Sequence, residues 1–330
     1  MLRLSLVVGA AMTFVFVLIA PAAMAAEKAD TGKAVAQCDR ECLYGYLDKY
    51  LDALLKKDPS SLPLARSVRF SENNVMMDIG DGLWNTISGK GDYDLRFADT
   101  KTGNVGWFGV VYENGIAAVI GLRIKVQRGL ITEVESVVNP RRGDGPFPNP
   151  QPQMLKKMPI LERIEPENTR SSRERLIALA DGYFGTLQQN DGTIHTEFSP
   201  DCNRQENGFQ TTNQPNPPVP SDIMKLGCEA QFKTGNFRYD DRLRQRRFPL
   251  VDEERGLVLA SAFIDHSGRL QQVVLTDGTV VPTHYHSPHS YVLFELFKIV
   301  DGKIRQIEAV FPTVPYNMPS PWFHSHGNHQ

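Results

Sequence analysis

Apolar residues recur at helical spacing in two distant parts of the chain. The segment "CLYGYLDKYLDALLKKD" repeats leucine and tyrosine every three or four residues, which predicts an amphipathic helix that ends at Asp58-Pro59. A second helix is predicted in "SSRERLIALADGYFGTLQQND", with Ser171 or Ser172 as its N-cap and Glu174 in its first turn. Each helix therefore buries one face against another part of the fold.

Alternating apolar and polar positions follow each helix and predict strands separated by Gly- or Asn-bearing turns. A helix followed by several antiparallel strands is typical of an α+β fold. The predicted strands of the first part are "SVRFSE", "DYDLRFAD", "NVGWFGVVYENG", "IAAVIGLRIKVQRG" and "LITEVESVV". Those of the second part are "GLVLASAFIDHSG", "SYVLFELFKIVDG" and "KIRQIEAVF".

The two parts share the order of these blocks, which indicates an internal duplication. "IKVQRGLITEVESVV" matches "FKIVDGKIRQIEAVF", with Gly129 against Gly302 and Glu135 against Glu308. "LRFADTKTGNVGWFGVVYENG" parallels "RRFPLVDEERGLVLASAFIDHSG", and "VRFSENN" parallels "TEFSPDCN". Between the copies, "NPRRGDGPFPNPQPQ" breaks the periodicity and predicts a linker.

These patterns divide the chain into five regions. Residues 1–25 have an early arginine, an apolar run and a small-residue end, which predicts a cleaved signal peptide rather than a retained membrane anchor. Export to the periplasm or the medium is therefore expected, with no membrane span in the mature form. The expected regions are 1–25 signal peptide, 38–138 first domain, 139–165 Pro/Gly-rich linker, 166–318 second domain and 319–330 His-rich flexible tail.

The cysteine content indicates disulfides, and the charge distribution argues against a nucleic-acid-binding protein. Four cysteines in an exported chain predict two disulfides. Three pairings are open, of which the local pairs Cys38–Cys42 and Cys202–Cys228 are favoured. The net charge is near neutral and only Arg242–Arg247 gathers basic residues, so a nucleic-acid partner is not expected.

The order of helix and strands resembles the NTF2-like, or SnoaL-like, cone-shaped α+β fold. "SENNVMMDIGDGLWNT", "GVVYENG", "RRFPLVDEERG" and "FKIVDGKIRQIEAVFPTVPYNMPSPW" also resemble an uncharacterised family of secreted SnoaL-related proteins of bacteria and fungi. The resemblance implies two tandem cone domains that form an internal pseudo-dimer, and a homo-oligomer through sheet faces. It also implies an apolar pocket for a hydrophobic or aromatic small molecule, and acid–base chemistry without a cofactor.

Candidate catalytic residues are polar groups within apolar strands of the second copy. Strand alternation places Glu295 on one face between Leu293 and Phe297, and a buried carboxylate suits acid–base chemistry because burial moves its pKa toward neutrality. The alternative is an ion pair of Glu295 with Arg246 or Arg247. The predicted catalytic set is His266, His289, Glu295 and Asp201.

Two members of this set have plainer explanations. Asp265-His266 suits a hairpin-capping pair as well as a general base oriented by a carboxylate, and Asp201 suits a loop turn beside a disulfide as well as the mouth of a pocket. The first copy has few titratable interior groups and is expected to be a structural or substrate-lid half. Predicted substrate contacts are Arg247, Tyr291, Phe263, Phe297 and His286, in a pocket lined also by Phe294, Tyr316 and Trp322.

Six of the eight histidines lie in two H-x-H-x-x-H runs. The first run, His284, His286 and His289, suits zinc or copper, hydrogen bonding at the pocket mouth, or a solvated loop. No metal is expected there, because no carboxylate or thiolate lies nearby at ligand spacing. The second run, His324, His326 and His329, lies in the terminal tail and is expected to fray.

Three functions remain open. The first is an exported, cofactor-independent lyase or isomerase acting on a hydrophobic or aromatic small molecule, because some NTF2-like enzymes release formaldehyde from lignin-derived aromatic dimers. The second is a non-catalytic periplasmic binding or assembly module. The third is a metalloenzyme built on the first histidine run.

Overall fold

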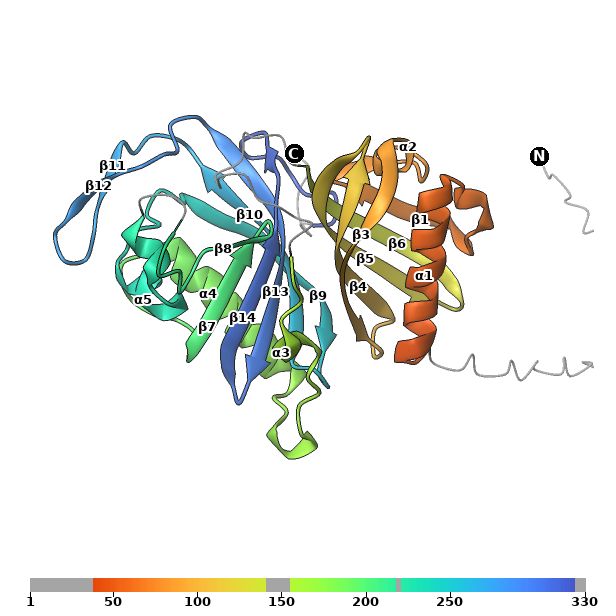
Figure 1. The fold of residues 1–330 in the computed structure, drawn as a ribbon, viewed down its shortest axis with the longest axis horizontal. Helices are drawn as coiled ribbons and strands as arrows, with labels where there is room; N and C mark the ends of the chain where they lie inside the picture. Colours follow the sequence, from red (N-terminus) through yellow and green to blue (C-terminus); the bar gives the residue numbers. More distant parts are fainter. Residues whose placement is uncertain (1–37, 141–154, 218–220, 324–330) are drawn as a thin grey trace, which may run out of the picture. The chain divides into compact units, whose positions relative to one another are not determined.

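The computed structural model describes residues 38–140, 155–217 and 221–323. Two large sheets, one in each half of the chain, confirm the α+β class (Figure 1). The expected signal peptide and the second histidine run lie outside the described residues. Within the described ranges, no helix is both long enough and apolar enough to cross a bilayer.

The first half forms a six-stranded sheet in the order β2-β1-β6-β5-β4-β3. β1 and β6 pair in parallel, whereas the other neighbouring strands are antiparallel. The helix α1 lies across one face of this sheet. The elements are α1 (Arg40–Lys56), η1 (Pro59–Ser61), β1 (Leu64–Glu72), β2 (Val75–Met77), α2 (Leu83–Thr86), β3 (Ile87–Asp99), β4 (Asn104–Glu113), β5 (Ile116–Gln127) and β6 (Leu130–Pro140).

The second half repeats this path as β8-β7-β14-β13-β10-β9, again with one parallel pair, β7 and β14. The shared strand order confirms the duplication. Its helices are α3 (Pro159–Glu162), η3 (Glu167–Thr169), α4 (Arg173–Gln189), η4 (Asp222–Lys225) and α5 (Cys228–Lys233). Its strands are β7 (Phe198–Glu206), β8 (Phe209–Gln210), β9 (Arg242–Asp252), β10 (Leu257–His266), β11 (Gln272–Val274), β12 (Val280–Pro282), β13 (His289–Val300), β14 (Lys303–Val310) and β15 (Thr313–Val314).

Side-chain caps mark the starts of both long helices, and a left-handed residue ends the first. The Asp39 side chain accepts the Cys42 backbone N–H at the start of α1, and Ser172 accepts the Arg175 N–H at the start of α4. α1 ends in a left-handed residue at Lys57, with φ 57°. The predicted Ser172 cap is confirmed.

One alignment within the duplication was wrong. Strand pairing matches Phe70, opposite Val134, with Arg204, opposite Ile307, so "SENN" corresponds to "QENG" rather than "VRFSENN" to "TEFSPDCN". Asn73 and Asn207 make the same contact, each accepting a backbone N–H from the neighbouring strand. The correct alignment therefore lies six residues further along the second copy than the aligned motifs suggested.

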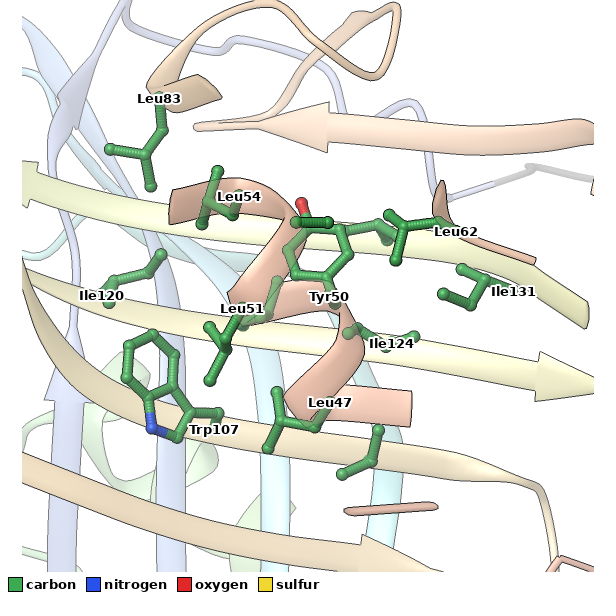
Figure 2. Packing of buried hydrophobic residues seen from close by; sticks show 14 of the residues in the cluster. Leu47, Tyr50, Leu51, Leu54, Leu62, Leu83, Trp107, Ile120, Ile124 and Ile131 are labelled. Carbon is green, nitrogen blue, oxygen red and sulfur yellow. The ribbon is translucent and has the colours of Figure 1, made fainter. Parts of the chain in front are cut away.

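The interior of the first half is an apolar core between α1 and the sheet. Figure 2 shows Leu47 and Leu51 of α1 beside Trp107, Ile120 and Ile124 of the sheet, and all five side chains are almost fully buried. Burial of this kind contributes about 1.5–3 kcal/mol for each large apolar side chain. This cluster is apolar, although burial also raises the pKa of Glu72, at the end of β1, to about 7.

The sheet faces turned away from α1 and α4 pack against each other in a further apolar core. Phe97 and Phe108 of the first sheet cluster with Leu259, Phe294 and Leu296 of the second. At its edge the Asp99 carboxylate accepts the Val251 N–H, and Asp252 accepts the Ala98 N–H. These contacts are as expected for an internal pseudo-dimer, in which equivalent residues of two copies exchange equivalent contacts.

Two arginines repeat this symmetry in ion pairs. Arg40, at the start of α1, pairs with Asp252, and Arg173, at the start of α4, pairs with Asp99. Both carboxylates are almost fully buried, so each pair links the helix of one half to the edge strand of the other. The predicted homo-oligomer stays a prediction, because the structure contains one chain.

Both local disulfides are present, Cys38–Cys42 and Cys202–Cys228. The expected linker, residues 139–165, begins within β6 and contains α3. The expected flexible tail, 319–330, is packed in its first residues: Trp322 is buried and donates to Ser71 Oγ at 2.7 Å. Burial of the large Trp322 ring stabilises this part of the chain, so the first residues of the expected tail are ordered.

Candidate functional site

A buried imidazole–carboxylate pair lies at the end of β10. His266 Nε2 is 2.7 Å from the Asp240 Oδ1, and the two residues are 2% and 7% exposed. The carboxylate accepts the Nε2 hydrogen, so in the neutral ring the lone pair lies on Nδ1. Within the described residues that Nδ1 has no hydrogen-bond partner. His266 is therefore oriented by one nitrogen and available to act as a base through the other.

Aromatic rings surround this imidazole. Tyr285 stacks on His266 with ring centroids 4.6 Å apart, and Tyr291 meets it edge-on at 4.9 Å. Tyr239 lies 4.7 Å from Tyr285. Burial raises the pKa of Tyr285 and Tyr239 well above the ordinary tyrosine value, so both hydroxyls stay protonated and can donate hydrogen bonds.

A second imidazole, His289, lies parallel to the first. The ring centroids of His266 and His289 are 4.6 Å apart with planes 9° apart. His289 Nδ1 is 2.8 Å from the Ser287 carbonyl, which fixes the hydrogen on Nδ1 and leaves Nε2 as the acceptor. Burial lowers the pKa of His289, and the neighbouring His266 lowers it as well. Two stacked rings so close do not readily both carry charge.

Deeper in the same half, an arginine is surrounded by polar partners. Arg204 is 4% exposed and donates to Gln231 Oε1 at 2.6 Å and to Thr211 Oγ1 at 3.1 Å. It also pairs with Glu206 at 3.4 Å and contacts the Tyr183 hydroxyl at 3.4 Å. The network satisfies a cation that would be expensive to bury alone.

Glu295 shares the interior with this arginine. Burial and, to a smaller extent, the Glu206 charge raise the pKa of Glu295, whereas Arg204 and a hydrogen bond with Tyr183 lower it. The net pKa is about 8. Glu295 is thus a neutral acid at pH 7. Glu206 also raises the pKa values of Tyr239 and Tyr291, so its charge acts on both groups of side chains.

The second half therefore holds a candidate base in its interior. Burial raises the pKa of Asp240, and the hydrogen bond with His266 opposes that rise. A histidine held by a carboxylate through one ring nitrogen is a common arrangement for a general base. His266 can accept a proton, whereas Glu295 lies six strand residues away, about 20 Å, and belongs to the Arg204 network.

The structure brings some of the predicted residues together. Alternation along β13 is as predicted: Tyr291, Leu293 and Phe297 join the interior core of the second half, and Phe294 and Leu296 face the first sheet. Glu295 is 3% exposed. Phe297 lies at the closed end of the interior, 5.0 Å from Tyr183, and is part of the packing there.

Other predicted contacts are wrong. Phe263 pairs across the strands with Val292 and packs with it on the opposite face, under the Arg244 guanidinium. Arg247 pairs with Glu135 of the first half, and Arg246 pairs with Asp181 of α4. Phe263 and Arg247 thus lie on the face opposite Glu295, and Arg246 is paired with α4 instead.

The capping alternative and the Asp201 prediction are also corrected. Asp265 does not orient His266 but binds Arg242, Arg244 and the Ser290 hydroxyl, because adjacent strand residues point to opposite faces. Asp201 is exposed and pairs with Arg305, away from the interior. Tyr316 is 38% exposed rather than part of a pocket lining.

The first histidine run is divided by the fold. His284 and His286 are exposed, whereas His289 enters the site. Among residues 38–140, 155–217 and 221–323, no three His, Cys, Asp or Glu side chains are grouped to hold a metal ion.

Four polar residues of the site were missed. Asp240 lies in an irregular segment before β9, where no periodicity marks it. Tyr285 lies in the loop before β13. Arg204 and Glu206 alternate toward the interior of β7, and matching "QENG" with "SENN" would have found them.

Comparisons with known proteins place a match on this half. A family model described as "Domain of unknown function (DUF8021)" matches residues 169–311. Among solved structures, the chain is similar to AclR from Streptomyces galilaeus, described as a "putative hydroxylase", with 18% identity and a TM-score of 0.27 over 43% of this chain and 91% of that chain. No curated protein matches the chain.

Proposed function

We propose that this protein is an exported, cofactor-independent acid–base enzyme, a lyase or isomerase acting on a hydrophobic or aromatic small molecule in the second half. The observation that carries the proposal is the buried His266–Asp240 pair with its unpartnered Nδ1. A structural histidine in a core normally has both ring nitrogens satisfied, because an unpaired buried polar atom is destabilising.

In the proposed reaction, His266 Nδ1 takes a proton from the substrate. Asp240 keeps the hydrogen on Nε2 and stabilises the imidazolium that forms. The imidazolium then gives this proton to the carbon or oxygen that gains charge. In an isomerase the proton returns to another atom of the same molecule.

The rings around His266 support an aromatic substrate. Tyr239, Tyr285 and Tyr291 offer apolar faces together with hydroxyl donors, which suits a ligand with an aromatic body and a polar end. A lyase reaction that fits is formaldehyde release from an aromatic dimer with a hydroxymethyl group. His266 takes the hydroxyl proton, the adjacent carbon–carbon bond breaks, formaldehyde leaves, and the imidazolium returns the proton to the remaining carbon.

Export is part of the proposal. The sequence of residues 1–25 has the pattern of a signal peptide, and the two disulfides suit an oxidising compartment. Mass spectrometry of the protein from its native host would reveal the mature N-terminus. A mature protein that still begins at Met1 would contradict cleavage.

The test is turnover of a panel of hydroxylated aromatic compounds, followed by formaldehyde release and ultraviolet absorbance. His266→Gln should lower turnover about 100- to 10,000-fold, the usual contribution of a general base. Asp240→Asn should also impair turnover, because it no longer fixes the tautomer. Glu113→Gln is the matched control, since Glu113 ends β4 as His266 ends β10. Full activity in His266→Gln would overturn the proposal.

A second candidate, a non-catalytic binding or assembly module, is favoured by the closed end of the same interior. Tyr183, Phe184, Phe198, Phe232 and Phe297 fill that end, each at most 6% exposed. Native mass spectrometry separates the two functions. A bound molecule that is recovered unchanged after prolonged incubation supports the binding module, whereas a changed mass supports the enzyme.

A further inference from the structure

One connection differs between the two halves of the duplication. β4 and β5 are joined by a tight turn at Asn114 and Gly115. The equivalent strands β10 and β13 are joined by residues 267–288, which contain the hairpin of β11 and β12. The second half, which holds the candidate site, therefore carries an insertion at the end of the strands nearest His266.

The insertion is tied at its base and at its tip. At the base, the backbone N–H and hydroxyl of Ser267 both bind the Asp241 carboxylate. At the tip, the Thr276 N–H donates to the Thr234 carbonyl at 2.9 Å, and its hydroxyl donates to the Lys233 carbonyl at 2.8 Å. The hairpin is thus tied to both ends of residues 234–241, the segment that carries Tyr239 and Asp240. Figure 1 shows β11 and β12 apart from the strands of the large sheet.

The insertion also supplies a ring of the site. Tyr285 lies between β12 and β13 and stacks on His266, with ring centroids 4.6 Å apart. The Tyr285 ring also contacts Tyr239, at a centroid distance of 4.7 Å. His266 is 2% exposed with this ring in place. Movement of the insertion would therefore uncover the imidazole.

Few interactions hold the hairpin down. β11 and β12 form a two-stranded sheet of their own, joined to neither large sheet. Leu270, Val274 and Val280 are 41%, 47% and 53% exposed, whereas Val273 is buried, so only one face of the hairpin is packed. Isolated two-stranded hairpins are marginally stable, and segments with little burial open at a low free energy.

We propose that residues 267–288 form a lid over the His266–Asp240 pair, with Tyr285 as its inner surface and the Thr276 contact as its latch. The lid exchanges between a closed form, which excludes water from the pair, and an open form, which admits the small molecule. The inference rests on the proposed function for what the lid admits, whereas the latch is a property of the fold alone.

The test measures exposure of His266 without any substrate. Diethyl pyrocarbonate modifies accessible imidazoles, and mass spectrometry gives the rate at His266 relative to exposed His195. Thr276→Ala should raise the relative rate about three- to ten-fold, as expected for loss of one net hydrogen bond. Thr276→Ser, which keeps the hydroxyl, should restore the original rate.

The matched control is Thr132→Ala, which removes a hydroxyl-to-carbonyl bond at 3.3 Å within the first sheet and should leave the rate unchanged. Hydrogen exchange of the unaltered protein is the second measurement, and amides 272–282 should exchange much faster than those of β13. Equal protection of the two segments, or an unchanged His266 rate in Thr276→Ala, would overturn the lid. Faster modification together with full turnover in His266→Gln would support the lid and contradict the proposed function.

Discussion

The two halves place different side chains at equivalent positions of the same sheet. In the first half Leu122 lies opposite Trp107, whereas in the second half Glu295 lies opposite Ala260. Phe70 of β1 lies in the apolar core of the first half, and Arg204 of β7 occupies the matching position in the second half. At these two positions the first half therefore has apolar side chains, whereas the second has a carboxyl and an arginine.

The difference shows what the fold itself needs. The first half has Leu122 and Phe70 at these positions, so the sheet and helix form without a carboxyl or an arginine there, although Glu72 is kept where the second half has Glu206. Burying Glu295 and Arg204 is unfavourable unless every partner is in place, and apolar replacements of buried ion pairs are often neutral or stabilising. The charges of the second half are thus better explained by chemistry than by stability.

The largest expected effect comes from moving the charge into the first half. Leu122→Glu should lower the unfolding free energy by about 4 kcal/mol at pH 7, because no arginine lies at the matching position. Urea unfolding measures this change. Leu122→Met is the control and should lower the unfolding free energy by less than about 1.5 kcal/mol. Equal stability of the two variants would show that the first interior tolerates charge.

The next effect comes from removing the cation of the second half. Arg204→Met leaves Glu206 and Gln231 without their partner and should lower the unfolding free energy by about 3 kcal/mol. Phe70→Met at the matching position should lower it by about 1 kcal/mol, since it replaces one apolar group by another. Equal losses in the two variants would contradict the account of the network.

The smallest expected effect is a pH dependence. The pKa of Glu295 is raised from 4.5 to about 8 in the folded protein, so folding favours its protonated form. This contribution is fully present below about pH 4.5 and is lost as the pH rises through about 8. Glu295→Gln does not titrate and should gain about 2 kcal/mol relative to the unaltered protein between pH 5 and pH 6.5. A constant difference over that range would indicate that Glu295 is ionised throughout.

Local pattern was enough to predict much of the fold. Helical spacing and caps give α1 and α4, including the Ser172 cap, and the separation of Cys202 and Cys228 around a polar loop gives one of the disulfides. Period-two alternation gives the interior position of Glu295. These signals lie within one segment, so the sequence carries them directly.

Contacts between segments could not be predicted in the same way. The partner of His266 is Asp240 rather than the adjacent Asp265, because neighbouring strand residues point to opposite faces and the true partner comes from a loop. Phe263 lies on the other face because its register pairs it with Val292. Arg204 was missed because the two copies were aligned six residues out of step.

The most direct test of the acid–base site is the tautomer of His266, measured by nitrogen-15 NMR of the histidine side chains. The assignment uses the His266→Gln variant, whose spectrum lacks one pair of ring signals. The account predicts that the neutral ring carries its hydrogen on Nε2, bound to Asp240, and that Asp240→Asn disturbs this preference. A neutral ring with its hydrogen on Nδ1 would contradict the account, because the nitrogen assigned as the base would then have no lone pair to accept a proton.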